Sequence, residues 1–200
     1  GIDWEVISPD LTRNNVAQQI PGGTPFTNEA AGGENYNTLM SLATSPHDPE
    51  VLWAGSDDGL VHITQDGGKT WKNVTPNGLE EGIINSIEVS PHDAETAYIT
   101  LMRYKFMDLT PYIYRTKDFG VNWELITEGI SGAHTFARVV RADPKVPGLL
   151  YAGTETGFYI SYTDGAQWET FQNNLPVVPI NDLFIQDNDL IAATAGRAFW

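Results

Sequence analysis

The chain of 200 residues contains no cysteine, which excludes disulfide bonds and cysteine-ligated zinc. It has no apolar run of membrane-spanning length, no sustained helical periodicity and no recognisable signal peptide. Basic residues are scarce, since 11 Lys and Arg stand against 26 Asp and Glu, for a formal net charge of -15. Such a charge repels nucleic acid and anionic lipid, so we expect neither nucleic-acid binding nor membrane insertion. A neutral glycan, a basic protein surface or a divalent cation fits it better.

The chain does have a turn motif that recurs at residues 64–71, 116–123 and 161–168. A hydroxyl residue is followed by Asp, then Gly, and then Trp at the eighth position. This pattern predicts a tight turn between two strands, in which Gly takes positive φ, Asp accepts backbone N–H bonds and Trp is buried. The residues expected in this structural role are Thr64, Asp66, Gly68, Trp71, Thr116, Asp118, Gly120, Trp123, Ser161, Asp164, Gly165 and Trp168. Because the third copy has Thr163 in place of Asp, either Asp164 takes over the turn or that turn is looser.

The motif resembles the Asp box, Ser/Thr-x-Asp-x-Gly-x-x-Trp, of sialidase-like (BNR) β-propellers, a group that includes sortilins and xyloglucan-degrading glycosidases. In the related glycosidases the Asp boxes lie away from the active centre, so the resemblance implies a structural role for these turns. Short strands surround each motif, and polar turns at 45–49, 90–94 and 142–148 precede the second strand of each unit. The sequence therefore predicts an all-β fold, a β-propeller of four-stranded antiparallel blades.

We expect one propeller segment over residues 1–200, with about three full blades and two partial ones. The expected parts are a partial blade at 1–10, a loop at 11–36, blades at 37–79, 84–130 and 137–175, and a partial blade at 180–200. Residues 4–8 are predicted to form an outermost strand. The two ends either close a four-bladed ring, with Trp4 beside Phe199, or leave an open arc that pairs with another copy or with the remainder of a parent chain. The first residue, Gly1, and the stop inside a strand favour an excised piece and the open arc.

Function in a propeller is expected where the repeats differ. His47-Asp48 and His92-Asp93 recur in register within Ser-Pro-His-Asp turns, so we interpret them as scaffold. These turns and the repeated motifs are expected at one end of the blades. The opposite face then carries the varied connections, including the loop at 102–111 and the Gly- and Pro-rich stretch at 14–35.

Two kinds of site are possible on that face. The carboxylates that could act as acid and base are Asp57, Asp58, Asp108, Glu155 and Asp182. Glycoside hydrolysis needs two such groups about 5 to 9.5 Å apart. Aromatic and basic side chains, which stack on sugars or anchor a protein, give the ligand-binding candidates Arg103, Tyr104, Lys105, Phe106, Tyr112, Arg138 and Arg197. A sialidase pattern would use the three arginines as a cluster and Tyr104 as the nucleophile.

Two further expectations concern charged pairs. Counting back from the turns places Ser41, Ser86, Arg138 and Asp182 at one level of the innermost strands. Arg138 and Asp182 then belong to adjacent blades and could form an ion pair near the channel. Asp57, Asp58 and Glu155 could hold Ca²⁺, although solvated turn residues are the alternative. No other metal and no cofactor is expected.

Over nearly its whole length the chain resembles large bacterial Asp-box proteins labelled glycosyl hydrolase or sortilin-like, notably at 52–62, 138–141 and 150–157. Residues 194–200 also resemble them, though a His is usual where Ala195 stands. The resemblance implies an extracellular or periplasmic bacterial protein. Our leading interpretation is a non-catalytic segment that binds a glycan or protein on the varied face. The alternatives are part of a glycoside hydrolase and a scaffold within a larger secreted protein.

Overall fold

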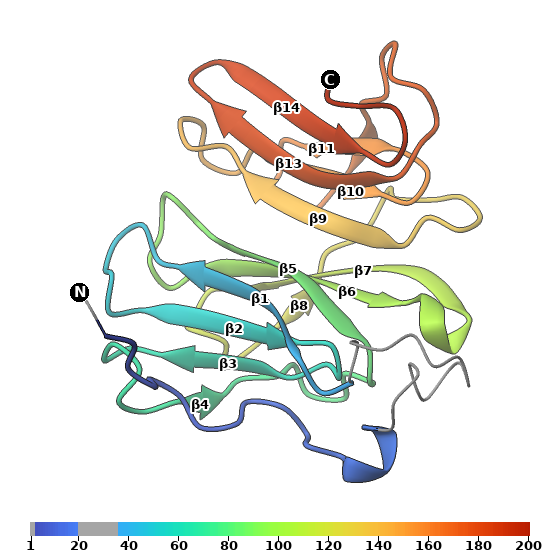
Figure 1. The fold of residues 1–200 in the computed structure, drawn as a ribbon. Helices are drawn as coiled ribbons and strands as arrows, with labels where there is room; N and C mark the ends of the chain where they lie inside the picture. The colour runs from blue at the N-terminus through green and yellow to red at the C-terminus, as the bar shows by residue number, and fades with distance from the viewer. Residues whose placement is uncertain (1–2, 20–35) are drawn as a thin grey trace.

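The computed structural model describes residues 3–19 and 36–200. Its strands form three four-stranded antiparallel sheets and one two-stranded sheet, which follow one another as blades of a β-propeller (Figure 1). The predicted all-β fold is confirmed. The helical segments of the described residues are two short 3-10 turns, η1 (Val16–Gln18) and η2 (Tyr104–Phe106). No helix in this part of the chain is long and apolar enough to cross a membrane.

Each blade is a meander, in which every strand pairs with the strand that follows it in sequence. Blade 1 consists of β1 (Leu39–Thr44), β2 (Leu52–Ser56), β3 (Val61–Thr64) and β4 (Lys72–Asn73). Blade 2 consists of β5 (Ile83–Val89), β6 (Ala97–Arg103), β7 (Asp108–Thr116) and β8 (Glu124–Leu125). Blade 3 consists of β9 (Ala137–Ala142), β10 (Leu150–Thr154), β11 (Phe158–Ser161) and β12 (Glu169–Thr170), and blade 4 of β13 (Ile180–Gln186) and β14 (Asp189–Thr194).

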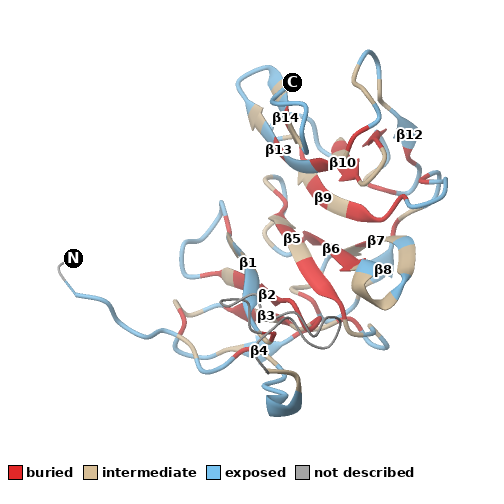
Figure 2. Cartoon of the chain, turned by 45° about the vertical axis from the view of Figure 1, so that its right-hand side comes forward, coloured by how far each residue is buried: buried red, intermediate tan, exposed pale blue. Residues whose placement is uncertain are grey.

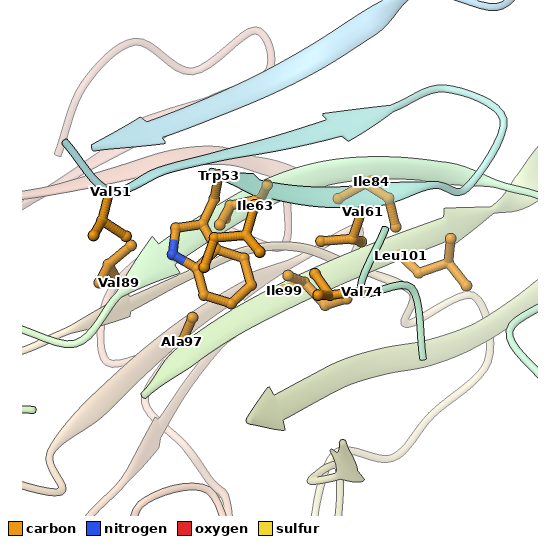
Figure 3. Close-up of a cluster of buried hydrophobic side chains, with 11 residues drawn as sticks. Val51, Trp53, Val61, Ile63, Val74, Ile84, Val89, Ala97, Ile99 and Leu101 are labelled. Atoms are coloured by element: carbon orange, nitrogen blue, oxygen red, sulfur yellow. The ribbon is translucent and has the colours of Figure 1, made fainter. Parts of the chain in front are cut away.

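Apolar side chains fill the space between neighbouring blades. Between blades 1 and 2, Trp53 and Ile63 pack against Ile84 and Ile99, all of them at most 2% exposed (Figure 3). Comparable clusters lie between blades 2 and 3 and between blades 3 and 4. Since each inner blade is covered on both sides, its strands bury residues of both faces, as Figure 2 shows for β5 and β9.

The histidines of the Ser-Pro-His-Asp turns connect successive blades. Nε2 of His47 lies 2.9 Å from the carbonyl oxygen of Ser90, and Nε2 of His92 lies 2.7 Å from that of Asp143. Each ring therefore reaches the equivalent turn of the next blade. These contacts between a histidine ring and a backbone carbonyl give both histidines a structural role, at the end of the molecule away from the varied connections.

The repeated turns share one hydrogen-bond scheme. In the first, Oγ1 of Thr64 accepts from the N–H of Gly68 at 2.9 Å, and Oδ1 of Asp66 accepts from that of Thr70 at 2.8 Å. The second turn repeats both bonds with Thr116 and Asp118, at 2.9 and 2.8 Å. Hydrogen bonds from the Thr70 hydroxyl and N–H lower the pKa of Asp66 to about 2. These carboxylates close turns and remain ionised at neutral pH.

The third turn corrects the expectation for Asp164. Oγ1 of Thr163 accepts a hydrogen bond from the N–H of Gln167 at 2.9 Å. Thr163 therefore accepts the same backbone hydrogen bond that the aspartate accepts in the first two turns. Asp164 stands one residue later, at φ 56°, where the first turn has Gly67. Its carboxylate accepts from the Tyr98 hydroxyl and pairs with Arg115 at 2.6 Å. Asp164 therefore joins blade 3 to blade 2, and the turn itself is as closed as the others.

The motif tryptophans bind each blade to the one before it. The indole Nε1 of Trp123 donates to the carbonyl of Val74 at 2.7 Å, and that of Trp168 donates to Ile126 at 2.7 Å. Both acceptors lie three residues after the motif tryptophan of the preceding blade. A Cβ added to Gly120 would lie 2.7 Å from Cβ of Val74, so glycine is required for this close approach.

The N-terminal residues occupy the position of an outer strand without pairing as one. Nε1 of Trp71 donates to the carbonyl of Ile7 at 2.8 Å, the contact that Val74 and Ile126 receive in later blades. Ile7 follows Trp4 by three residues, so this segment is equivalent to the fourth strands. The predicted strand at 4–8 is nevertheless wrong, because these residues form no ladder and Trp4 is fully exposed. Most of the loop predicted at 11–36 lies outside the described residues.

Candidate functional site

The varied face is formed by the β2–β3 turn, the β6–β7 loop, the β10–β11 turn and the connections between blades. Its residues are tied together at Arg103, at the end of β6. The guanidinium pairs with Glu80 and, at 2.5 Å, with Asp108, and its Nε donates to the Glu81 carbonyl at 3.0 Å. The Tyr112 hydroxyl donates to the same Asp108 carboxylate at 2.9 Å. Arg103 therefore fixes the β6–β7 loop to the connection between blades 1 and 2.

The residues after Arg103 form a turn of 3-10 helix that presents an aromatic ring to solvent. Tyr104 is 40% exposed and stacks on Phe136, with ring centroids 5.6 Å apart and planes at 21°. On the Arg103 side, the guanidinium carbon lies 5.5 Å from the centroid of Phe106. Tyr104 is exposed and Phe106 is half-buried, so neither ring is fully buried against its own chain.

Phe136 also supports the second charged pair of this face. The guanidinium carbon of Arg138 lies 5.3 Å from its ring centroid, and Nε of Arg138 donates to Glu155 at 2.6 Å. The backbone N–H of Glu155 donates to the carbonyl of Phe136 at 3.1 Å. We call the group Tyr104, Phe136, Arg138 and Glu155 the Phe136 surface. Sequence reasoning named three of its members and missed Phe136, an aromatic residue that directly precedes β9.

Arg138 pairs with Glu155 rather than with Asp182, which corrects the predicted ion pair. The prediction counted back along the strands from the first residue of each turn, and took Ala142 as that residue in blade 3. The structurally equivalent residue is Asp143, which precedes a proline as Ser45 and Ser90 do. The N–H of Asp143 also donates across its turn as those of the two serines do. A shift of one residue moves a side chain to the opposite face of the strand. Arg138 is accordingly the extra residue of a β-bulge. The residue of β9 that is equivalent to Asp182 of β13 is Val139.

Asp182 pairs instead with Arg141, which the sequence analysis did not consider. Nη2 of Arg141 lies 2.6 Å from the carboxylate of Asp182, and Nη1 donates to the Ser86 hydroxyl at 2.9 Å. Glu88 lies 3.6 Å from the same guanidinium, and burial raises its pKa to about 7. A count from the prolines would have placed Glu88 and Arg141 at one level. Together they connect the first strands of blades 2, 3 and 4.

Asp57 and Asp58 are buried, so the expectation of solvated turn residues is wrong. Asp58 is 0% exposed and accepts from the Arg13 N–H at 2.7 Å, from Asn37 at 2.6 Å and from the Ser56 hydroxyl. Asp57 accepts from the backbone N–H of Thr38 at 2.8 Å, and burial raises its pKa. Both carboxylate oxygens of Asp58 thus accept hydrogen bonds from protein donors.

The structure does not bring the proposed calcium ligands together. Glu155 occupies in blade 3 the position of Asp57 in blade 1, with blade 2 between them, and Glu155 is paired with Arg138. Within residues 3–19 and 36–200, no three Asp, Glu, His or Cys side chains are grouped so as to hold a metal ion. Arg197, in the turn after β14, is exposed and donates no hydrogen bond to a described residue. The other two arginines of the predicted cluster, Arg103 and Arg138, are each paired with a carboxylate.

No protein-family model matches the chain. It is 31% identical over 93 residues to an oligoxyloglucan-reducing end-specific xyloglucanase of Emericella nidulans, a match that covers 45% of this chain and 11% of that enzyme. It is 32% identical over 127 residues to a probable enzyme of the same name from Neosartorya fischeri, covering 58% of this chain and 15% of that protein. The crystal structure of the GH74 enzyme of Niastella koreensis superposes with a TM-score of 0.65 at 15% identity, over 80% of this chain and 26% of that one. The chain therefore has the fold of a region of GH74 β-propellers, and spans a small part of the curated relatives it matches.

Proposed function

We propose that the chain is part of a glycoside hydrolase acting on a xyloglucan-type glucan, and that its sugar-contacting site is the Phe136 surface. The observation that carries the proposal is the exposed ring of Tyr104, which is fixed by its stacking on Phe136 beside the Arg138–Glu155 pair. An aromatic face packs against the apolar face of a pyranose. A neighbouring guanidinium and carboxylate supply donors and acceptors for sugar hydroxyls. The local similarity to two xyloglucanases supports the substrate class.

The charge of the chain also favours a neutral polysaccharide. A net charge of -15 would repel an acidic sugar at long range, whereas an uncharged glucan carries no such penalty. Because a polymeric glucan of this kind is met outside the cell, the proposal includes an extracellular or periplasmic location.

Hydrolysis would further require a carboxyl group that keeps its proton near neutral pH. Asp57 is the one sequence-predicted candidate whose pKa is raised, and burial is the largest cause. Asp108, Glu155 and Asp182 are instead paired with arginines. The catalytic part of the proposal therefore takes Asp57 as the candidate general acid, because burial favours its protonated form. Binding without hydrolysis, by the same Phe136 surface, is the second candidate function.

Calorimetric titration with xyloglucan oligosaccharides tests the binding part. Tyr104→Ala should weaken the affinity about fivefold, since an aromatic contact contributes about 1 kcal/mol. Tyr162→Ala is the matched control, because Tyr162 is 64% exposed but lies in the third repeated turn at the other end of the blades. Absence of binding by the unmodified chain, or equal losses for both variants, would overturn the assignment of this surface.

Release of reducing ends from the same oligosaccharides separates the two candidate functions. Asp57→Asn should abolish hydrolysis and leave affinity unchanged, whereas Asp48→Asn, at an exposed turn on the opposite face, should leave both unchanged. Binding that depends on Tyr104 without any release of reducing ends would favour the binding function. Hydrolysis that persists in Asp57→Asn would exclude Asp57 as the acid.

A further inference from the structure

The loop between β6 and β7 holds a methionine in a backbone conformation that favours glycine. Met107 has φ 60° and ψ 18°, in the left-handed region. A bulky side chain is disfavoured there, because its Cβ comes too close to the backbone. Met107 is also 88% exposed, so burial does not offset this strain. The fold therefore presents an apolar side chain to water in a strained conformation.

Other residues with positive φ have an evident local reason for it. Six of the nine such non-glycine residues within 3–19 and 36–200 are Asn, Asp or His, the types that tolerate it best. Phe119, a bulky exception, packs against the core between blades 1 and 2. Met107 has neither a tolerant side chain nor a core to pack on. An observed strain that the fold does not use points to function.

The loop is fixed in the position that exposes Met107. Arg103 and Asp108, which flank the turn, are paired in the ladder between β6 and β7 and joined by an ion pair at 2.5 Å. The N–H of Met107 donates to the carbonyl of Tyr104 at 3.0 Å, so these two residues belong to one tight turn. Phe136, on which Tyr104 stacks, is anchored in a buried apolar cluster. Tyr104 and Met107 are therefore neighbouring exposed groups on a rigid support.

We propose that Met107 is a sugar-contacting residue beside the Phe136 surface, and that oxidation of its thioether by hydrogen peroxide weakens binding. The proposal rests on the proposed function of that surface. An unbranched, polarisable thioether packs well on the C–H face of a pyranose, next to the ring of Tyr104. In the oxidation, an S–O bond forms at Sδ as the peroxide O–O bond breaks. The sulfur loses two electrons, the peroxide is reduced to water, and the polar sulfoxide no longer makes the apolar contact.

Exposure predicts which methionine is oxidised first. The chain contains three methionines. Met107 is 88% exposed, Met40 is 50% exposed, and Met102 is 5% exposed in the cluster that contains Phe136. Because the peroxide must reach the sulfur, Met107 should react first and Met102 last. Methionine sulfoxide reductase reverses the reaction, so the modification provides a reversible control of binding.

Peptide mass spectrometry after limited treatment with hydrogen peroxide tests the modification. We expect sulfoxide at Met107 before it forms at either of the other two methionines. Sulfoxide that forms at Met102 as fast as at Met107, or a Met107 that stays unmodified, would overturn this part of the proposal.

Met107→Gly separates a contact with sugar from a role in the fold. Glycine accepts positive φ without strain, so the variant should have a Tm higher by about 2 °C. Its affinity for xyloglucan oligosaccharides in calorimetric titration should fall about fivefold, because the apolar contact is removed. A lower Tm would show that Met107 serves the fold, and an unchanged affinity would show that it makes no contact. Either result would overturn the proposal.

Titration of a peroxide-treated Met40→Leu variant tests the effect of oxidation on binding. Its affinity should fall about fivefold and be restored by methionine sulfoxide reductase. The matched control carries both Met40→Leu and Met107→Leu. Leucine keeps an apolar side chain without an oxidisable sulfur, so this variant should bind equally well before and after treatment. An equal fall in the control would place the sensitive group elsewhere and overturn the assignment to Met107.

The same titrations distinguish failure of this inference from failure of the proposed function. If the unmodified chain binds no oligosaccharide, the proposed function is wrong and the role of Met107 in binding falls with it. If binding depends on Tyr104 but is unaffected by Met107→Gly and by peroxide, the proposed function stands and this inference alone is wrong.

Discussion

Replacing Glu88 by Gln should stabilise the protein at pH 8 and change it little at pH 5. The carboxyl of Glu88 lies 3.6 Å from the guanidinium of Arg141 and accepts the Ala142 N–H at 3.2 Å. Burial outweighs both contacts and raises its pKa to about 7. The folded state therefore holds the proton more tightly than the unfolded state. The stability due to Glu88 is complete below about pH 4.5 and is lost as the pH rises through 7.

The magnitude follows from the difference between an ordinary Glu pKa and about 7. It corresponds to at most about 3 kcal/mol, and to about 1–2 kcal/mol if water partly screens the side chain, which is 22% exposed. Gln keeps the acceptor for Ala142 and carries no charge. Thermal unfolding at pH 8 should show a higher Tm, by about 2–4 °C for each kcal/mol. Glu124→Gln, on the exposed β8, is the control and should change Tm little.

A lower stability of Glu88→Gln at pH 8 would refute this reasoning, because it would mean that attraction to Arg141 exceeds the cost of burying the charge.

Three other substitutions or treatments test the scaffold. Trp168→Phe should cost about 1–3 kcal/mol of unfolding free energy by urea denaturation, and more than Trp71→Phe, because Trp168 is 2% exposed and its lost bond leaves a buried carbonyl unpaired. Equal costs would contradict that account. Asp164→Ala should cost about 1–3 kcal/mol, since Arg115 loses its partner in the next blade; an unchanged urea midpoint would show that the pair is dispensable. Addition of calcium or EDTA should leave Tm unchanged, because Asp57 and Asp58 already accept hydrogen bonds from protein donors. A rise in Tm with calcium would reveal an ion site.

The blade repeat could be predicted from the sequence because each blade repeats the same local chemistry. A hydroxyl, an acceptor, a glycine and a tryptophan at fixed spacing specify one turn, whatever surrounds it. The structure adds that Trp123 and Trp168 reach backwards to the preceding blade. That contact depends on how neighbouring blades pack, and the spacing of residues within one repeat carries no information about this packing.

The candidate site was harder to predict because it depends on register. Counting from Ala142 instead of Asp143 displaced β9 by one residue and assigned Arg138 the wrong partner. The same error concealed the neighbours Glu88 and Arg141. Blade 3 has no Ser-Pro-His-Asp turn from which to count. Its Pro144 nevertheless occupies the same position as Pro46 and Pro91 in the other two turns, and counting from the prolines gives the correct register.

Burial of the β2–β3 turn could not be predicted from composition either. Adjacent carboxylates in a turn are usually solvated, yet Asp58 is covered by Arg13 and Asn37 from segments distant in sequence. Phe136 was missed because it stands alone before β9, and only the fold places it under Tyr104.

Chemical-shift mapping of a xyloglucan oligosaccharide on the ¹⁵N-labelled chain tests the central claim most directly. The account predicts that the sugar shifts amide resonances at 103–108 and 136–138, around the Phe136 surface, and leaves those of the turns at 64–71 and 116–123 in place. Shifts concentrated in the repeated turns, or none at saturating sugar, would contradict the claim that this face binds glucan.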